Sequence, residues 1–319
     1  MADRAGVSRS TVSRAFTPGR SISADARTRV LRAARELGYE PDGLAKGLIS
    51  GRSGIVGILI GELANPIHAV LHQALSFKLQ RHGLIPVAAQ LGAGVGTAEI
   101  VAMFRRYRAE VVVLTSMQVT TALLSACKRG GLRVLLVNRI DAEGAVPSIC
   151  ADLEQGGELA ARHLAAGGRR RIAVVEGVAG SWTSKARLAG HLAGLRAAGL
   201  APVSVVAGGY AYADGAAAAE AIAALQCDGV LCPNDLFAIG LMDRLRHGLG
   251  CKVPDDVAVV GFDDIPMAQW TAHDLTTVRL PIERMTDRAV NEIVEIGQEG
   301  LLDPTRIWVP CRLVERRSA

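Results

Sequence analysis

The feature of this sequence that most restricts its fold is a regular alternation of apolar runs and amphipathic segments from Gly54 onwards. The apolar runs predict buried strands at residues 55–60, 85–89, 111–115, 133–137, 148–150, 172–176, 203–206, 229–232 and 257–261. The amphipathic segments predict helices at residues 66–82, 97–106, 155–166, 184–198, 215–225 and 236–248. Such alternation is typical of parallel sheets with helices on both faces. Two successive sets of these units predict an α/β core of two doubly wound parallel-sheet subdomains.

Ligands of such folds bind at the carboxyl ends of the strands. Polar side chains recur at or just beyond these predicted ends: Asn138, Arg139, Asp152, Arg187, Asn234, Asp235, Asp263 and Asp264. Carboxylate, amide and guanidinium groups together suit a hydroxyl-rich ligand, which needs paired donors and acceptors. Trp182, Tyr210 and Phe262 could supply an apolar face. Each polar residue alone could equally be loop polarity or a helix cap, and we expect Asp235 to be a cap.

A different pattern lies near the beginning of the chain. Gly6 suits a tight turn, and the Ser8 hydroxyl is placed to accept the backbone N–H of Thr11 as a helix N-cap. The outward face of the helix that follows holds Arg9, Ser10, Ser13 and Arg14. A further helix is expected from Ser23 to Leu37, with Val30, Ala34 and Leu37 as its apolar stripe. Three short helices of this kind predict a helix-turn-helix domain whose second helix enters a DNA groove; the alternative is a surface helix with a chance cap.

The distribution of charge supports DNA binding. Residues 1–53 contain ten basic and five acidic residues, which is the whole net charge of +5, while the other 266 residues carry 26 of each. Excess positive charge beside a recognition helix can displace counterions from phosphates.

Residues 41–53 read as a connector between a domain at 1–40 and the core at 54–319. Leu44 and Leu48 have i,i+4 spacing, but three glycines make a helix this short unstable alone. We expect it to fold only when two copies meet on a palindromic DNA site.

Other chemistry is weakly represented. The glycines at 92, 94 and 96 do not match the dinucleotide fingerprint. His68 and His72 are four residues apart, but no third metal ligand accompanies them. Six scattered cysteines, no signal peptide before the first motif and no bilayer-length apolar run favour a cytoplasmic protein. We expect no enzymatic activity, no cofactor, no metal site and no membrane association. The alternatives are a sugar-binding transport protein and an α/β enzyme acting on a sugar or nucleotide.

Taken together, the chain resembles the lactose-repressor/galactose-repressor family of bacterial transcription regulators along its whole length. The stretches that carry the resemblance are Ala5-Gly-Val-Ser with Thr11-Val-Ser-Arg14, Leu37-Gly-Tyr-x-Pro41, Asn65-Pro66, Val137-Asn-Arg139, Arg187-Leu-Ala-Gly190, Asn234-Asp235, Val260-Gly-Phe-Asp-Asp264 and Leu275-Thr-Thr-Val-Arg279. The first helix begins later than the family pattern, so we expect either a start assigned too late or a shortened helix.

The resemblance implies a repressor that binds a palindromic operator as a homodimer and responds to a small polar effector. It implies base contacts by Arg9 and Ser10, with Arg14 contributing. On the connector it implies DNA contacts by Ala45 and Leu48, with Leu48 as a minor-groove wedge. Effector positions correspond to Asn138, Arg187, Asn234 and Asp263, with Tyr210 packing beside them. With Asn65, Arg139, Asp152 and Trp182 these form the expected effector set. The resemblance also implies a core like that of periplasmic sugar-binding proteins. The resemblance predicts two subdomains, one of residues 54–151 with 281–305 and the other of residues 153–278 with 308–319. Three crossings would join them, near 151–153, 278–281 and 305–308.

Overall fold

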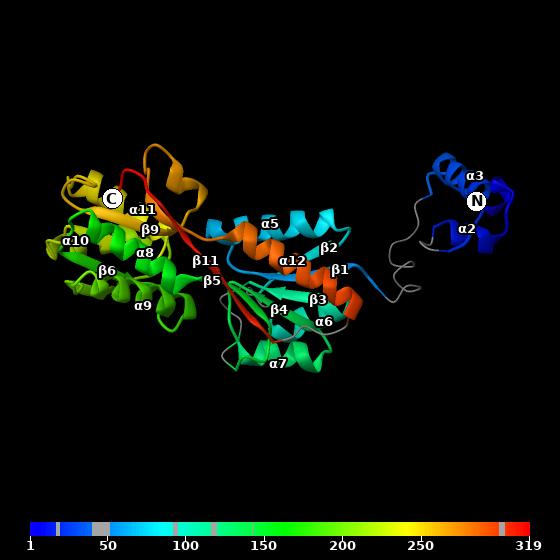
Figure 1. The fold of residues 1–319 in the computed structure, drawn as a ribbon, viewed down its shortest axis with the longest axis horizontal. Helices are drawn as coiled ribbons and strands as arrows, with labels where there is room; N and C mark the ends of the chain where they lie inside the picture. Colours follow the sequence, from blue (N-terminus) through cyan, green and yellow to red (C-terminus); the bar gives the residue numbers. More distant parts are fainter. Residues whose placement is uncertain (17–19, 40–51, 92–94, 116–119, 142, 300–303) are drawn as a thin grey trace. The chain divides into compact units, whose positions relative to one another are not determined.

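The computed structural model describes residues 1–16, 20–39, 52–91, 95–115, 120–141, 143–299 and 304–319 (Figure 1). The chain divides into two compact units, Met1–Gly54 and Ile55–Ala319, and each is described by itself. Most of the connector predicted at 41–53, with Ala45 and Leu48, lies outside the described residues.

The first unit contains three helices, α1 (Ala2–Ala5), α2 (Arg9–Ala15) and α3 (Ala24–Glu36). Gly6 ends α1 in the left-handed conformation with φ of 62°, which a residue without a Cβ adopts at no steric cost. The small core consists of Ala5, Ala15, Val30 and Ala33. Leu37 was expected in this core, but 53% of its surface is exposed, because it follows the last turn of α3 as its C-cap.

The second unit consists of two lobes. The first lobe is built on the strands β1 (Ile55–Ile60), β2 (Ile85–Gln90), β3 (Val111–Leu114), β4 (Arg133–Val137), β5 (Ser148–Asp152) and β11 (Arg306–Pro310). They form a parallel sheet in the order β11-β5-β4-β3-β1-β2. Its helices are α5 (Pro66–Arg81), α6 (Thr97–Arg106), α7 (Thr121–Arg129) and α12 (Ile282–Glu299).

Successive residues of the central strands point to opposite faces of this sheet. Ile58 and Val113 belong to one apolar cluster, which includes residues of α5 and α12. Leu59 and Val112 belong to a second cluster with residues of α6 and α7. Figure 1 shows these two helix pairs on opposite sides of the sheet. Both faces are therefore buried, which explains why the strands read as continuous apolar runs.

The second lobe repeats this arrangement. Its strands are β6 (Ile172–Glu176), β7 (Ser204–Ala207), β8 (Gly229–Leu231), β9 (Ala258–Asp263), β10 (Thr276–Arg279) and β12 (Arg312–Val314), in the order β12-β10-β9-β8-β6-β7. Its helices are α8 (Leu153–Ala166), α9 (Trp182–Ala197), α10 (Tyr212–Ala224), α11 (Asp235–Asp243) with a π-helical turn at Arg244–Gly248, and a 3-10 turn at Pro266–Gln269. Only β12 is antiparallel to its neighbour among the described strands. The predicted pair of doubly wound sheets is confirmed.

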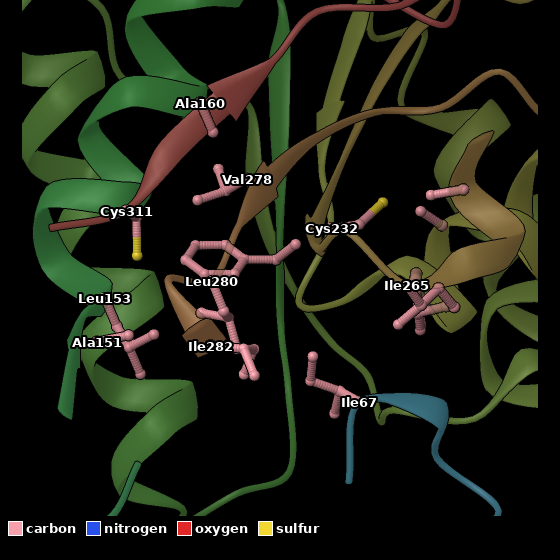
Figure 2. Packing of buried hydrophobic residues seen from close by; sticks show 14 of the residues in the cluster. Ile67, Ala151, Leu153, Ala160, Cys232, Ile265, Val278, Leu280, Ile282 and Cys311 are labelled. Atoms are coloured by element: carbon pink, nitrogen blue, oxygen red, sulfur yellow. The ribbon is translucent and has the colours of Figure 1, made fainter. Parts of the chain in front are cut away.

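The chain crosses between the lobes three times in the described residues: at Asp152–Leu153, between Arg279 and Ile282, and at Cys311. The third crossing was expected at 305–308. It comes later because β11, the red strand in Figure 1, pairs with β5 of the first lobe as far as Pro310. Figure 2 shows apolar residues from all three crossings packed in one cluster, among them Leu153, Leu280 and Cys311.

Five elements were not predicted: α7, α12, β10, β11 and β12. No helix in the described part of the chain is both long and apolar enough to span a bilayer.

Candidate functional site

Helix α2 presents the outward face that its sequence predicts. The Ser8 side chain accepts the backbone N–H of Thr11 at 3.1 Å, which confirms the predicted N-cap. Ala15 is buried in the small core and fixes which side of the helix faces inwards. The residues on the other side, Arg9, Ser10, Ser13 and Arg14, are exposed. A polar, basic face on the second of three short helices is suited to the major groove of DNA.

Helix α3 adds positive charge to the same unit. Arg27, Arg32 and Arg35 are all exposed. The Ser23 side chain caps the helix by accepting the N–H of Ala26 at 3.3 Å. An exposed row of arginines next to a recognition helix suits contacts with phosphates.

A small cavity of about 30 Å³ lies between the two lobes of the second unit. Seven of the nine predicted effector residues line it: Asn65, Asn138, Arg139, Arg187, Tyr210, Asn234 and Asp263. Ile67, His68 and Thr183 line it as well and were not predicted. Residues from strand ends and helix N-termini of both lobes thus meet at one point, as expected for paired doubly wound sheets.

Arg187 and Asp263 form the central ion pair of this cavity. Arg187 lies on α9 and is 6% exposed. One of its Nη atoms donates to Asp263 Oδ1 at 2.6 Å, and the other donates to the Pro233 carbonyl at 2.5 Å. Its guanidinium lies 4.2 Å from the centre of the Phe262 ring. Phe262 was expected to provide an apolar surface for the ligand. Its ring packs against the Arg187 guanidinium instead. Burial raises the pKa of Asp263, and the charge of Arg187 opposes this shift.

The backbone is strained where polar residues follow the strands. Asn138 after β4 has φ of 55°, Asp263 at the end of β9 has 114°, and Asp264 has 57°. Non-glycine residues in this region cost free energy and persist only where surrounding contacts hold them. Strand β4 is the fourth of the first lobe and β9 the fourth of the second, so Asn138 and Asp263 occupy equivalent ends of the two sheets.

The loop after β9 is held by Asp235, the first residue of α11. Its carboxylate accepts the Ile265 N–H at 2.8 Å and the Thr277 hydroxyl at 2.5 Å. Burial raises the pKa of Asp235 well above its usual value, and the nearby carboxylate of Asp263 adds to this. Asp235 was expected to be the cap of α11, but the N-cap is Asn234. The Asn234 side chain accepts the Phe237 N–H and donates to the Tyr210 carbonyl, both at 3.0 Å.

Two polar atoms of residues that line the cavity have no hydrogen-bond partner among the described residues. They are Asn138 Oδ1 and Arg187 Nε, and both are buried. Leaving a buried donor or acceptor unsatisfied costs about 1–3 kcal/mol. A ligand that both accepts and donates hydrogen bonds would satisfy them.

His68, on the first turn of α5, is the main residue that sequence reasoning placed elsewhere. It was considered for a metal pair with His72, but it lines the cavity instead. Burial, with the charges of Arg139 and Arg187, lowers its pKa to about 4. The imidazole is therefore neutral at physiological pH and can both donate and accept.

Two predicted residues, Asp152 and Trp182, do not line the cavity in the described structure. Asp152 caps α8 by accepting the Gln155 N–H at 3.0 Å. The Trp182 ring packs against Trp308 of the other lobe, with 6.0 Å between ring centres.

A larger cavity of about 620 Å³ adjoins the small one and shares Asn65, His68 and Tyr210 with it. Its other polar lining residues include Glu62, Gln90 and Tyr212. A ligand anchored at Arg187 could extend in this direction.

Comparison with known proteins agrees with both parts of this description. Residues 1–42 match the model of bacterial regulatory proteins of the lacI family, and residues 161–319 match a periplasmic binding protein-like domain. The HTH-type transcriptional regulator MalR of Streptomyces coelicolor is 33% identical, over 100% of this chain and 95% of its own length.

Two solved structures support the same assignment. A complex of the transcriptional regulator CelR with cellobiose has a TM-score of 0.77 and 28% identity, covering 100% of this chain and 98% of its own. A lac repressor dimer bound to operator and the anti-inducer ONPF has a TM-score of 0.87 and 25% identity, covering 99% and 97%. With its helix-turn-helix unit and two-lobed core, the chain belongs to the lacI family of bacterial regulatory proteins, and it is a DNA-binding transcriptional regulator.

Proposed function

We propose that this regulator is a repressor whose affinity for its operator is controlled by a sugar, or a related polyol or sugar acid, bound between the two lobes. The observation that carries the proposal is the pair of unsatisfied buried atoms, Asn138 Oδ1 of the first lobe and Arg187 Nε of the second, whose residues line the same cavity. An apolar ligand would leave both atoms without partners. A molecule with several hydroxyl groups satisfies donors and acceptors together.

The remaining lining supports a sugar more than another polar ligand. Asp263 and Arg187 can bind adjacent hydroxyl groups, and the Tyr210 ring offers an apolar surface for a sugar face. The small cavity, at about 30 Å³, has room for about one water molecule, so the sugar ring itself would extend into the adjoining cavity of about 620 Å³. The cellobiose complex of the related regulator CelR is consistent with this class of ligand.

The DNA contacts belong to the first unit. We assign base contacts to Arg9 and Ser10, with Arg14 and the hydroxyls of Ser8 and Ser13 supporting base or phosphate contacts. Ala45 and Leu48 remain assigned to the DNA on the resemblance alone. The cytoplasm, where bacterial DNA lies, is the expected compartment.

We further propose a homodimer on a palindromic operator. Helix α5 carries an exposed Phe77 (61%) beside the buried, unsatisfied atoms His72 Nδ1 and Ser76 Oγ. These three residues line a groove of about 660 Å³ along α5 that Pro266 of the other lobe also borders. A second copy seated here would cover the ring and offer partners to both polar atoms. The related lac repressor is a dimer in its operator complex.

The link between the two binding events runs through the three crossings. A ligand that changes how the lobes stand to each other changes the spacing of the segments that lead to the DNA-binding units. Such coupling is typically about 1–3 kcal/mol, and it acts equally in both directions.

The proposal is tested on the full-length protein by thermal shift with ribose, glucose, cellobiose, maltose and gluconate, followed by calorimetry with the best ligand. We expect Arg187→Lys to weaken the ligand at least tenfold, because lysine keeps the charge and loses the planar fork. Arg196→Lys is the matched control, since Arg196 is exposed on the same helix. The affinity of this variant for the ligand should equal that of the unmodified protein. Unchanged affinity in Arg187→Lys, or no shift with any of these compounds, would contradict the proposed effector site.

A further inference from the structure

A third cavity, of about 440 Å³, lies at the segments that cross between the lobes. One wall is apolar and includes Ile67 and Val70 of α5 with Leu280 and Ile282 of the second crossing. Figure 2 shows Leu280 and Ile282 on one segment with Ile67 beside them. Pro310, at the third crossing, also lines the cavity. The cavity therefore contacts two of the three connections and both lobes.

The rest of the lining is charged and contains three arginines and three carboxylates, Asp263, Asp264 and Glu283. Arg279 and Arg312 line the cavity and are direct cross-strand partners in the antiparallel pair of β10 and β12. Arg284, from the first turn of α12, lines it as a third arginine. Like charges directly opposite each other on a sheet destabilise it. Asp264 compensates the charge of Arg279, so the uncompensated charge of this pair is that of Arg312.

Each of the three carboxylates that line the cavity is already paired with a basic residue other than Arg284 and Arg312. Asp264 accepts from Arg279 Nε at 2.5 Å with one oxygen and from Arg316 Nη2 at 2.7 Å with the other. Glu283 is paired with Lys78 at 2.8 Å, and Asp263 is paired with Arg187. Within the described residues, neither Arg284 nor Arg312 has a carboxylate at ion-pair distance. Two exposed guanidinium groups thus face the cavity without a counter-ion from the protein.

We propose that this cavity is a second ligand site, which binds a small organic carboxylate with an apolar body. The guanidinium forks of Arg312 and Arg284 match the geometry of a carboxylate. The aliphatic wall of Ile67, Val70, Leu280 and Ile282 takes the ring or branched chain. A carboxylate held here replaces the missing counter-ion and covers apolar surface at the crossings.

The position of the site gives it a consequence for regulation, which rests on the proposed effector function. Ile67 and Asp263 line both this cavity and the small cavity between the lobes. A carboxylate in contact with both crossings stabilises one arrangement of the lobes. Binding of the carboxylate therefore changes the affinity of the protein for the sugar. By linkage, binding of the sugar changes the affinity of the protein for the carboxylate by the same factor.

The test uses the full-length protein at low salt and ligand-observed NMR titration with benzoate and 4-methylpentanoate. Benzyl alcohol and inorganic phosphate serve as probes that lack the charge or the apolar body. We expect saturable binding of both carboxylates and at least tenfold weaker binding of the other two. Arg312→Gln should weaken benzoate at least tenfold, whereas Arg196→Gln, an exposed arginine on α9, should leave it unchanged.

Two results would overturn the site. One is benzoate binding that is absent or equally affected by Arg312→Gln and Arg196→Gln. The other is loss of benzoate binding in Arg187→Lys with no loss in Arg312→Gln, since the carboxylate would then occupy the effector cavity. Because benzoate binding is measured directly, the second site is tested even if no sugar binds.

Discussion

At the scale of single residues, burial keeps two imidazoles in their neutral form near the small cavity between the lobes, which is the proposed effector cavity. His191 of α9 is 1% exposed, and its ring centre lies 6.4 Å from that of Phe262. Burial, with the charge of Arg187, lowers its pKa to about 3, while that of His68 falls to about 4. Neither imidazole adds positive charge beside Arg139 and Arg187 at neutral pH.

His191 should make the stability of the protein depend on pH. The unfolded chain takes up a proton at this residue as pH falls below about 6.5, whereas the folded protein does so only near pH 3. The free energy of unfolding is therefore not reduced by His191 above pH 6.5, and it decreases as the pH falls below that value. By pH 5 the loss is about 2 kcal/mol for this residue. We expect urea unfolding at pH 7.5 and pH 5 to show that loss in the unmodified protein.

The comparison with two variants isolates the contribution of His191. In His191→Gln the difference between the two pH values should shrink by about 2 kcal/mol. His247→Gln is the control, because His247 is exposed, and its pH dependence should match that of the unmodified protein. Equal pH dependence in all three proteins would mean that His191 does not titrate in this way.

Strand ends determine which of the predicted residues line the small cavity between the lobes. Asn138, Asn234 and Asp263 follow predicted strands, and the parallel sheets bring them to one cavity. His68 and Thr183 were missed because they lie on the first turns of α5 and α9, where nothing in their local sequence distinguishes them from other helix residues. Asp152 was misplaced because an aspartate after a strand can equally cap the next helix, as it does here.

At the scale of elements, the parallel strands that alternate with predicted helices were predictable, whereas β10, β11 and β12 were not. Strands β1 and β6 have the bounds predicted for them, because every residue of such a strand is largely apolar. Strands β11 and β12 lie at sheet edges and are half-exposed, so they show no continuous apolar run. Helix α12 was missed although Met285, Ala289 and Ile293 have helical spacing and are buried.

The contact between α8 and α9 fixes the position of Arg187. A Cβ added at Gly190 would overlap the backbone carbonyl of Glu154 on α8. Gly190→Ala should therefore force the helices apart, which typically costs about 1–3 kcal/mol. We expect lower stability in urea unfolding and weaker sugar binding, because Arg187 lies one turn away on α9.

Gly167→Ala gives the matched control for this prediction. Its added Cβ would meet the nearest atom, the His163 carbonyl oxygen, at 3.4 Å, which is ordinary van der Waals contact. Its stability and ligand affinity should stay close to those of the unmodified protein. If Gly190→Ala is tolerated equally well, the close packing of α8 and α9 does not position Arg187.

At the scale of the whole molecule, the two lobes repeat one topology and are held together at their crossings. Within the second lobe, the Asp264 carboxylate after β9 binds Arg279 of β10, where the second crossing begins, and Arg316, which follows β12. Its neighbour Asp263 lines the effector cavity. Two consecutive residues therefore connect the proposed effector cavity to two of the crossing segments.

The fold class and the first two crossings followed from the alternation of elements and from the family resemblance. The third crossing was misplaced because β11 was not predicted, so nothing marked where the chain leaves the first lobe.

The dimer proposed above gives a prediction for operator binding. Phe77→Glu places a charge on the exposed face of α5 and should convert the dimer into monomers, measured by sedimentation velocity. Operator affinity should then fall about 100-fold or more, because the second half-site is no longer bound intramolecularly. Sugar affinity should be unchanged, since Phe77 does not line the cavity between the lobes.

Tyr107→Glu is the control, because Tyr107 is 50% exposed and lies outside the groove along α5. This variant should remain dimeric and keep its operator affinity. A Phe77→Glu protein that stays dimeric would show that α5 does not form the interface. Monomers with full operator affinity would show that one DNA-binding unit is sufficient.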